Sequence, residues 1–341
     1  MPARCDIDTA RRSNRATAPI FLSTKGTNID MNYFSVVSAQ IIIFLVYATI
    51  GVIARKTNIL NEQSLDMLAR FIIKISLPIM IFMYTVNGAT KETFLSALPI
   101  LPATACLYVF LAALAFVMSH VFRLQGNEKN VYRACIMFGN IGFMGIPIIC
   151  AVFPEHGMLY VGLFTIIDQL LQWTVGVNLT TPIEGGAPPL RTRLMKMVNP
   201  STIGIILALV AIFAEVRIPE PASGALMTVG SITTPLALIY LGALFSGLTI
   251  SASVKRIEFY GSILCKMCLF PILFCQFLHW WNLPEDMIVT LCLLSSMPTM
   301  VALAMLAKTQ RSAGDYAAAM IFVATLSSIV TIPLVCFFLR S

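Results

Sequence analysis

The amino-acid sequence predicts an all-α membrane protein, and three observations carry this prediction. Of its 341 residues, 58% are hydrophobic. Only 11% are charged, which is less than half of the roughly 25% typical of soluble globular domains. Apolar runs of about 20 residues, the length that crosses a bilayer as a helix, recur along the whole chain. This composition argues against a soluble enzyme, a nucleic-acid-binding protein and a disordered scaffold, although the net charge is +7.

Ten apolar runs are long enough to be membrane-spanning helices. The connections between them are short, except that a stretch rich in Pro, Gly and charge separates the fifth run from the sixth. We therefore expect a first five-helix repeat over 31–180, a linker over 181–198 and a second five-helix repeat over 199–341. The ten predicted spans are 33–54, 65–86, 96–121, 131–153, 157–180, 199–218, 225–247, 257–279, 287–307 and 313–339.

Lys and Arg residues in the loops predict the orientation of these spans, because cytoplasmic loops carry an excess of both. Twelve lie on one side of the predicted membrane and three on the other. We therefore expect a multi-pass protein of the cell membrane, with the 181–198 linker in the cytoplasm and both termini outside. The twelve are Arg55, Lys56, Arg123, Lys129, Arg133, Arg191, Arg193, Lys196, Lys255, Arg256, Lys308 and Arg311, and the three are Lys91, Arg217 and Arg340.

The first 30 residues conflict with this orientation, because they carry five Lys and Arg residues that would have to cross the membrane. They contain no apolar stretch of the kind that a signal peptide has. Met31 stands immediately before the first predicted span. We expect Met31 to be the true start, with 1–30 as a disordered extension or a mis-assigned start.

Residues that would indicate an enzyme or a cofactor are scattered. Eight of the nine cysteines lie within apolar runs at irregular spacing, so no disulfide framework is predicted. The three histidines are far apart, and neither a P-loop nor a Gly-rich dinucleotide motif occurs. We expect no catalytic residues, no metal and no cofactor.

The two halves show signs of an internal repeat. Because each half has an odd number of spans, the second half must be inverted relative to the first, as in many secondary transporters. Three residue pairs share nearly the same separation: Pro78 and Pro235 are 157 apart, Tyr160 and Tyr316 are 156 apart, and Asn140 and Ser296 are 156 apart.

The fourth and ninth spans carry the strongest signal for a binding site. Gly and Pro destabilise a continuous helix; the fourth span has several near its middle, and the ninth has Pro298 after two serines. Paired interruptions at corresponding positions of two halves are typical of a transporter binding site, and the N-terminus of a half-helix suits a carboxylate. The alternative is a kinked helix that packs through small residues. The predicted substrate-binding residues are Gly139, Asn140, Gly142, Pro147, Ser295, Ser296 and Pro298.

Three ionisable residues lie roughly in the middle of their predicted spans, so they are expected near the membrane centre: Lys74, Asp168 and Lys266. Ionisable groups at this depth are costly and often functional. We expect them to serve in coupling or in charge balance, with Asp168 neutralising one lysine and the other facing a substrate anion or carrying a proton. The alternative is that the lysine side chains snorkel toward an interface.

Several segments in order resemble the auxin efflux carrier family, which includes the plant PIN carriers and many bacterial permeases. They are "GVIARKTNIL" (51–60), "FGNIGFMGIP" (138–147), "NPSTIG" (199–204), "MPTMVALAMLAK" (297–308) and "TLSSIVTIP" (325–333). The resemblance implies a five-plus-five inverted repeat, broken fourth and ninth helices that cross at the membrane centre, and a scaffold and a transport half that move relative to each other. It also implies that Asn140 helps to hold the substrate carboxylate. The plant carriers have a proline where this chain has Gly139, and a longer loop than 181–198, so auxin is a disfavoured substrate; bacterial relatives are associated with malate and malonate.

Together these observations predict a secondary transporter that moves a small organic anion, such as a dicarboxylate, across the lipid bilayer by alternating access. Protons are the first expectation for a coupling ion. A sodium-coupled carrier of the bile-acid type and an auxin-like monocarboxylate efflux carrier stay open as alternatives, as does a homodimer. A membrane-embedded enzyme, a receptor and a channel are less economical, because none of them needs paired broken helices. A nucleic-acid partner is not expected.

Overall fold

The computed structural model describes residues 33–88, 90–183, 200–216, 218–247 and 255–339. Within these ranges the chain is helical, and its only β-type pairing is one isolated bridge. Four π-helical turns, labelled η, interrupt the α-helices. The helices are α1 (Tyr33–Lys56), α2 (Glu62–Phe71), η2 (Ile72–Ser76), α3 (Leu77–Gly88), α4 (Lys91–Ala97), α5 (Ile100–Val121), α6 (Gly126–Met137), η3 (Ile141–Gly145), α7 (Ile146–Val152), α8 (Gly157–Leu171), η4 (Gln172–Gly176), α9 (Val177–Thr180), α11 (Pro200–Phe213), α12 (Glu220–Ser231), α13 (Thr233–Ser246), α14 (Ile257–Ser262), η7 (Ile263–Leu269), α15 (Phe270–His279), α16 (Glu285–Ser296), α17 (Ala302–Thr309) and α18 (Gly314–Phe338).

Seven helical stretches in the described ranges are long and apolar enough to cross a membrane, which confirms a multi-pass membrane protein. They are Phe34–Lys56, Glu62–Asn87, Lys91–Val121, Gly157–Thr180, Glu220–Ser246, Ile257–His279 and Gly314–Phe338. The other three predicted spans fall on shorter helices. The fourth and ninth are interrupted by non-helical residues, as their Gly and Pro residues predicted, and the sixth coincides with α11. Most of the predicted 181–198 linker and the predicted extension over 1–30 lie outside the described residues.

Two glycines allow α1 and α13 to pack backbone against backbone. A Cβ atom added to Gly242 on α13 would lie 1.9 Å from the carbonyl oxygen of Ala48, and one added to Gly51 on α1 would lie 2.0 Å from that of Ile239. No side chain fits at either distance. This use of small residues replaces the hydrophobic driving force that helices lack in lipid.

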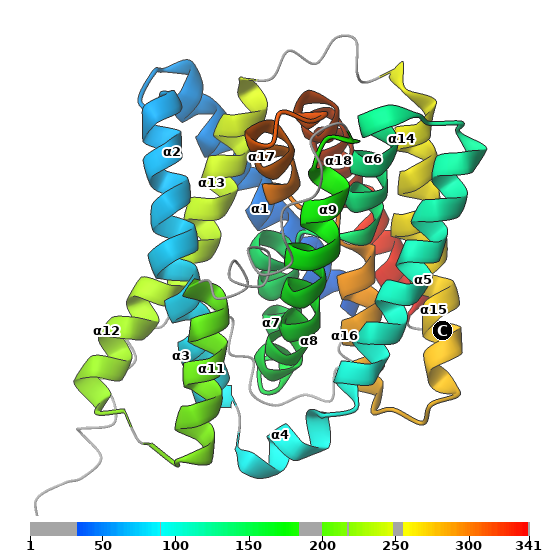
Figure 1. Cartoon of the computed structure of the whole chain (residues 1–341). Coiled ribbons are helices and arrows are strands. Elements are labelled where there is room, and N and C mark those ends of the chain that lie inside the picture. Colours follow the sequence, from blue (N-terminus) through cyan, green and yellow to red (C-terminus); the bar gives the residue numbers. More distant parts are fainter. Residues whose placement is uncertain (1–32, 89, 184–199, 217, 248–254, 340–341) are drawn as a thin grey trace, which may run out of the picture. The chain divides into compact units, whose positions relative to one another are not determined.

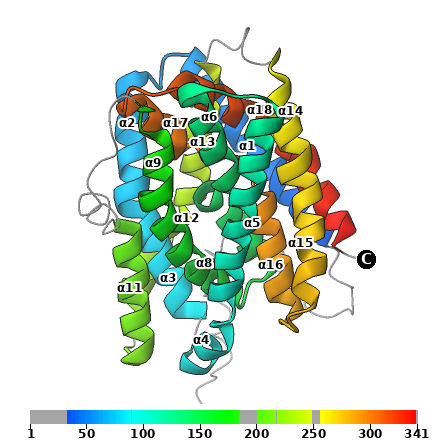
Figure 2. The same ribbon diagram turned by 45° about the vertical axis from the view of Figure 1, so that its right-hand side comes forward.

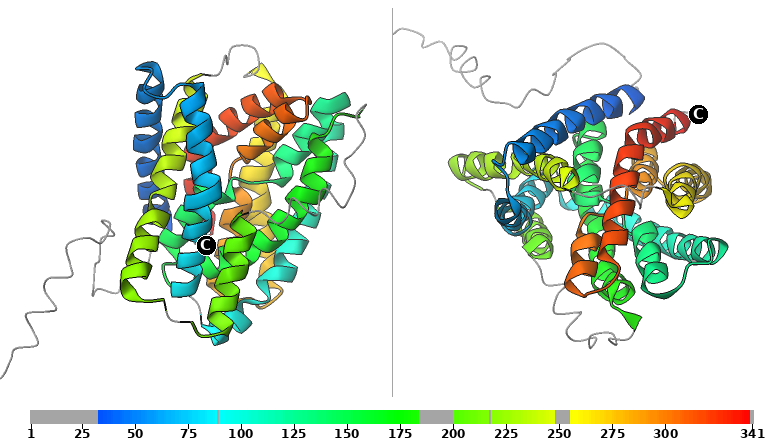
Figure 3. Two further views of the ribbon diagram at one scale, coloured as in Figure 1. Left: turned by 60° about the vertical axis from the view of Figure 1, so that its left-hand side comes forward. Right: turned by 90° about the horizontal axis from the view of Figure 1, so that it is seen from above.

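The helices of residues 33–339 sort by their contacts into two groups. The flanking group comprises α1, α2 with η2 and α3, α11, α12 and α13; within it, α1 packs on α13, and α3 packs on α11 and α12. The crossing group comprises α5 to α9 and α14 to α18 with their π-helical turns, in which α5 packs on α6 and α8, α15 on α16, and α18 on α17 and η7. Helices α1 and α3 connect the groups through α7, α18 and α8. Figure 1 shows most of the flanking group on the left, and the view from above in Figure 3 separates the same helices.

The two ends of the bundle differ in the Lys and Arg residues near them. The junctions α1–α2, α5–α6 and α17–α18 and the start of α14 lie at the upper end in Figures 1 and 2, and these are the connections where most of the Lys and Arg residues of the described loops occur. Helix α4, which begins with Lys91, lies at the lower end. The Lys and Arg residues that the sequence assigned to one side of the membrane therefore lie mostly near one end of the helical bundle.

Candidate functional site

The interruptions of the fourth and ninth predicted spans meet in space. Gly139, between α6 and η3, forms an antiparallel bridge with Thr299, between α16 and α17. The backbone N–H of Asn140 donates to the carbonyl of Pro298 at 2.7 Å, and the N–H of Met300 donates to the carbonyl of Phe138 at 3.1 Å. Unwound backbone inside a membrane needs such partners because lipid supplies none. The two broken helices therefore cross and satisfy each other's main chains.

Side chains bind two further carbonyls at this crossing, where the last carbonyls of α6 and α16 lack intrahelical donors. The Thr299 hydroxyl donates to the carbonyl of Cys135 on α6 at 3.0 Å. The Lys266 ammonium, on η7, donates to the carbonyl of Met297, the residue directly after α16.

Asn140 has the one buried amide at the crossing that lacks a partner. Its backbone (φ −80°, ψ 65°) and the 2.9 Å bond from the Ile141 N–H to the Gly139 carbonyl form an inverse γ-turn with Asn140 at its centre. The side chain is 3% exposed, and its Nδ2 atom has no hydrogen-bond acceptor among the described residues. The other buried unpartnered side-chain atoms in the described part of the chain are Ser and Thr hydroxyls. Unlike these, a carboxamide cannot simply rotate onto the carbonyl one turn earlier in its own helix.

Gly142, two residues after Asn140, faces α3 of the flanking group without a side chain of its own. A Cβ atom added to half-buried Gly142 would come within 4 Å of one atom only, the Cδ2 of Leu77 on α3, at 3.9 Å. Pro147 occupies the first turn of α7, where its missing N–H costs nothing. The helix Ile141–Val152 starts directly after Asn140, so its N-terminus lies beside Gly142.

The hydroxyls of the two predicted serines of the ninth span already form hydrogen bonds within their own helix, α16. The Ser295 hydroxyl donates to the carbonyl of Cys292, and the Ser296 hydroxyl donates to that of Leu293, both at 2.7 Å. Both serines and Pro298 are buried at the crossing. The structure thus brings Gly139 and Asn140 to Pro298 and the end of α16, whereas Gly142 faces α3 and Pro147 lies in α7. Of the predicted residues, only Asn140 has a buried side-chain donor without a partner among the described residues.

Lys266 also lies at the crossing, where it bonds to the carbonyl of Met297. Its side chain is 4% exposed and lines a cavity of about 10 Å³, roughly the space for one water molecule. Tyr108, Gly139 and Ser295 line the same cavity, whereas Asn140 does not.

Asp168 is buried within the crossing group. It is 3% exposed, and its carboxylate accepts hydrogen bonds from the Tyr108 hydroxyl and, at 3.4 Å, from Gln169 Nε2. Tyr108 thus lies between Asp168 and the cavity beside Lys266. Sequence reasoning did not identify Tyr108, since one tyrosine in the apolar run 96–121 gives no signal of its own.

Lys74 differs from the other two ionisable residues because its side chain is exposed. It lies on η2 in the flanking group. A π-helical turn contains or adjoins four of the candidate residues. Lys74 lies on η2 and Lys266 on η7. Asn140 directly precedes η3, and the carbonyl of Asp168 accepts from the N–H of Gln172 at the start of η4. Such turns are frequent at functional sites.

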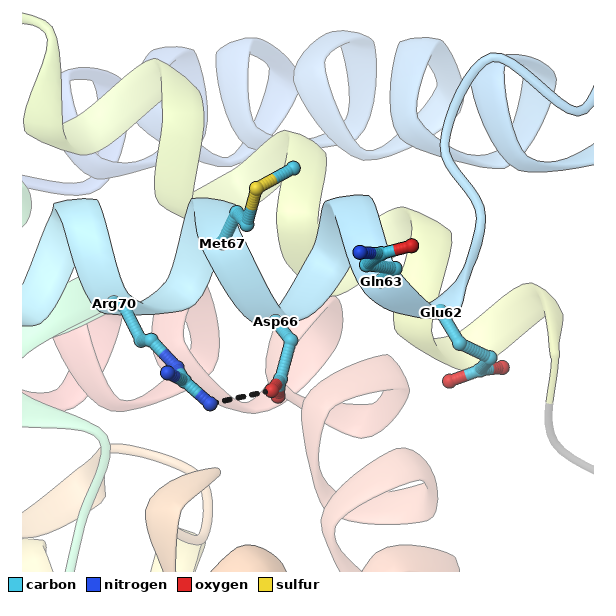
Figure 4. A pocket seen from close by; sticks show the side chains of 5 residues that line it. All are labelled: Glu62, Gln63, Asp66, Met67 and Arg70. Carbon is cyan, nitrogen blue, oxygen red and sulfur yellow. Dashed lines mark hydrogen bonds and ion pairs between the residues drawn. The ribbon is translucent and has the colours of Figure 1, made fainter.

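A shallow hollow on the surface of α2 is a weaker candidate. Figure 4 shows its five lining residues, Glu62, Gln63, Asp66, Met67 and Arg70, all from one helix. Asp66 and Arg70 form an exposed 3.0 Å ion pair one turn apart, which adds little stability. The hollow lacks the converging buried groups of the crossing.

The two tyrosines of the predicted repeat each bind a carboxylate near one end of the bundle. Tyr160 at the start of α8 donates to Asp286 Oδ2 at 2.8 Å, and Tyr316 at the start of α18 donates to Glu258 Oε1 at 3.4 Å. Near Tyr316, the guanidinium of Arg256 binds both carboxylate oxygens of Glu128 at 2.6 and 3.0 Å, and these hydrogen bonds raise the pKa of Arg256.

At the opposite end, Lys91 pairs with Glu215 at 2.8 Å, and its hydrogen bond lowers the pKa of that exposed carboxyl. No group of three or more His, Cys, Asp or Glu side chains that could hold a metal ion occurs in the described ranges.

Comparison with known proteins assigns the chain to a family. The family model described as "Membrane transport protein" matches residues 36–188 and 190–336. An uncharacterised transporter of Methanocaldococcus jannaschii is 25% identical over 229 residues, which are 64% of this chain and 70% of that protein. The resemblance noted in the sequence is thereby confirmed: the chain belongs to the membrane transport protein family, that of the auxin efflux carriers, and is a multi-pass membrane transporter.

Proposed function

We propose that this transporter carries small organic anions by alternating access, with dicarboxylates such as malate or malonate as its substrates. The single observation that supports this most is the buried, unpartnered amide of Asn140 at the crossing. Leaving a buried donor unpaired costs about 1–3 kcal/mol, and a substrate carboxylate would supply the missing acceptor.

The surroundings of Asn140 fit this role. Its Nδ2 would donate to one carboxylate oxygen, and the first N–H groups of the helix Ile141–Val152, which have no intrahelical acceptors, would add positive potential. In this proposal the rest of the anion would lie beside Gly142, between η3 of the crossing group and α3 of the flanking group, where the glycine has no side chain to obstruct it. In this proposal Ser295, Ser296 and Pro298 shape the site from behind, and Pro147 fixes the start of α7.

We further propose the ten-span, five-plus-five inverted arrangement, with 31–180 and 199–341 as its repeats. The crossing of the two interrupted segments supports it, as do Tyr160 and Tyr316, each bonded to a carboxylate near its own end of the bundle. The flanking group would serve as the scaffold against which the crossing group moves. The end rich in Lys and Arg would face the cytoplasm, with both termini outside.

Asp168 is our candidate for proton coupling. Among the described residues its buried carboxyl is bonded to neutral donors alone, Tyr108 and Gln169, so it can lose or gain a proton without breaking an ion pair there. Tyr108 also lines the cavity at the crossing, so a proton on Asp168 would change the hydrogen bonding of a residue next to the site.

Counterflow of labelled malate and malonate into proteoliposomes tests the proposal. Wild-type protein should show saturable counterflow, and Asn140→Ala should reduce it at least about tenfold, because loss of a hydrogen bond to a charged group is worth about 1.5–3 kcal/mol. Asn87→Ala, an exposed asparagine on α3, is the matched control and should retain the wild-type rate.

Normal counterflow in Asn140→Ala would move the site away from the first interruption while keeping the carrier. Correctly reconstituted wild-type protein that exchanges neither acid would refute the dicarboxylate assignment.

A further inference from the structure

We propose that Lys266 is a built-in cation, whose ammonium takes the place of a coupling ion behind the helix crossing, so that the carrier works without sodium. This inference rests on the proposed function in one respect, namely that an anion binds at the same crossing. It concerns the coupling ion, for which the sequence left both protons and sodium open, and it argues against sodium.

The contacts of Lys266 support this role. Its ammonium donates to the carbonyl of Met297, where α16 ends. No carboxylate among the described residues forms an ion pair with it. Among the described residues the buried Lys266 side chain is thus held by a main-chain carbonyl, with no opposite charge in contact with it.

The position of Lys266 is the one that a coupling cation would need. In transporters with broken helices, unwound carbonyls and the C-terminal ends of half-helices coordinate sodium, because the helix dipole is negative there. In this chain the corresponding carbonyl at the end of α16 is already bonded to an ammonium. The adjoining cavity, at about 10 Å³, has room for about one water molecule.

Lys266 and Asn140 lie on different sides of the first interruption. Gly139 and Ile141 line the cavity beside Lys266, while Asn140, between them in the γ-turn, does not. The ammonium therefore acts on a bound anion through the field of the crossing and not by direct contact. Its charge would partly balance that of the substrate in the low-dielectric interior, which is the work that a sodium ion does in a symporter.

The test replaces the tethered cation with a free one. Lys266→Ala removes three methylenes and the ammonium, which n-propylammonium matches in size and charge. Wild-type counterflow should be the same in sodium and in choline media. In choline, Lys266→Ala should lose at least about tenfold in rate, and millimolar n-propylammonium or sodium should restore a large part of it. Lys56→Ala, which changes an exposed lysine at the end of α1, is the matched control and should gain no cation dependence.

Thermal unfolding in detergent gives a readout that is independent of transport. Sodium or n-propylammonium should raise the unfolding temperature of Lys266→Ala and leave that of the wild type unchanged. This shift tests the inference even if neither dicarboxylate proves to be the substrate.

A sodium requirement of the wild type would overturn the proposal, as would full activity of Lys266→Ala in choline. A folded variant that no cation stabilises or restores would do so as well. If Lys266→Ala does not fold, the sodium dependence of wild-type transport and of wild-type unfolding still decides.

Discussion

The two interruptions that cross at the centre of this protein look alike in sequence and differ in chemistry. The first, at 138–140, presents a buried amide with no partner. In the second, at 297–301, the Thr299 hydroxyl and the Met297 carbonyl are already bonded, to α6 and to Lys266 respectively. The two interruptions of a repeated architecture can therefore have different roles. In our proposal the first binds the substrate, and the second stabilises the crossing.

The largest expected effect comes from filling the first interruption. A Cβ atom at Gly139 would lie 3.3 Å from the Cβ of Met297, so a leucine there has to displace the second interruption or fill the small cavity. We expect Gly139→Leu to cost about 1–3 kcal/mol and to abolish counterflow, because overpacking forces backbone shifts. Thermal unfolding and counterflow measure this, with Gly224→Leu as the control, since a Cβ there meets nothing within 4 Å. Unchanged stability would mean that the two interruptions are not held closely together.

A smaller effect is expected at the second interruption. Thr299→Val keeps the shape of the side chain and removes the donor to the Cys135 carbonyl. We expect a loss of about 1 kcal/mol of stability and a lower unfolding temperature, with the substrate affinity largely kept. Thr228→Val is the control, because that exposed hydroxyl bonds within its own helix. A loss of substrate affinity without a loss of stability would contradict a purely holding role.

The smallest effect is expected for the two serines of α16. Their hydroxyls bond to carbonyls of their own helix, so Ser295→Ala and Ser296→Ala should change stability by no more than about 0.5 kcal/mol and counterflow by no more than about twofold. The same assays apply. A loss as large as that of Asn140→Ala would show that both interruptions bind substrate and that the proposed difference between their roles is wrong.

The fold was predictable wherever apolar length was the signal. Seven predicted spans match long helices, and the positions of the interruptions followed from Gly139 and Pro298, since both residue types weaken a continuous helix. The π-helical turns could not be predicted, because one extra residue in a turn leaves the hydrophobic pattern of a lipid-embedded helix almost unchanged.

The candidate site was predictable as a set of residues and not as a geometry. The sequence indicated Asn140 and the buried Asp168 and Lys266 by their polarity within apolar runs. It could not reveal that Lys266 bonds to a carbonyl 31 residues away, or that Lys74 is exposed, because both facts depend on which face of each helix packs against the others. Tyr108 was missed for the same reason.

The bond between Lys266 and Met297 also bears on how the chain is made. During synthesis the segment Ile257–His279 reaches the translocon before α16 exists, and a lysine near its centre opposes partitioning into lipid by about 2.5–3.5 kcal/mol. The acceptor that satisfies the ammonium arrives only with the following span. If the two segments insert together as a helical hairpin, Lys266 enters the bilayer with its acceptor already present. If they insert one after the other, it enters without one.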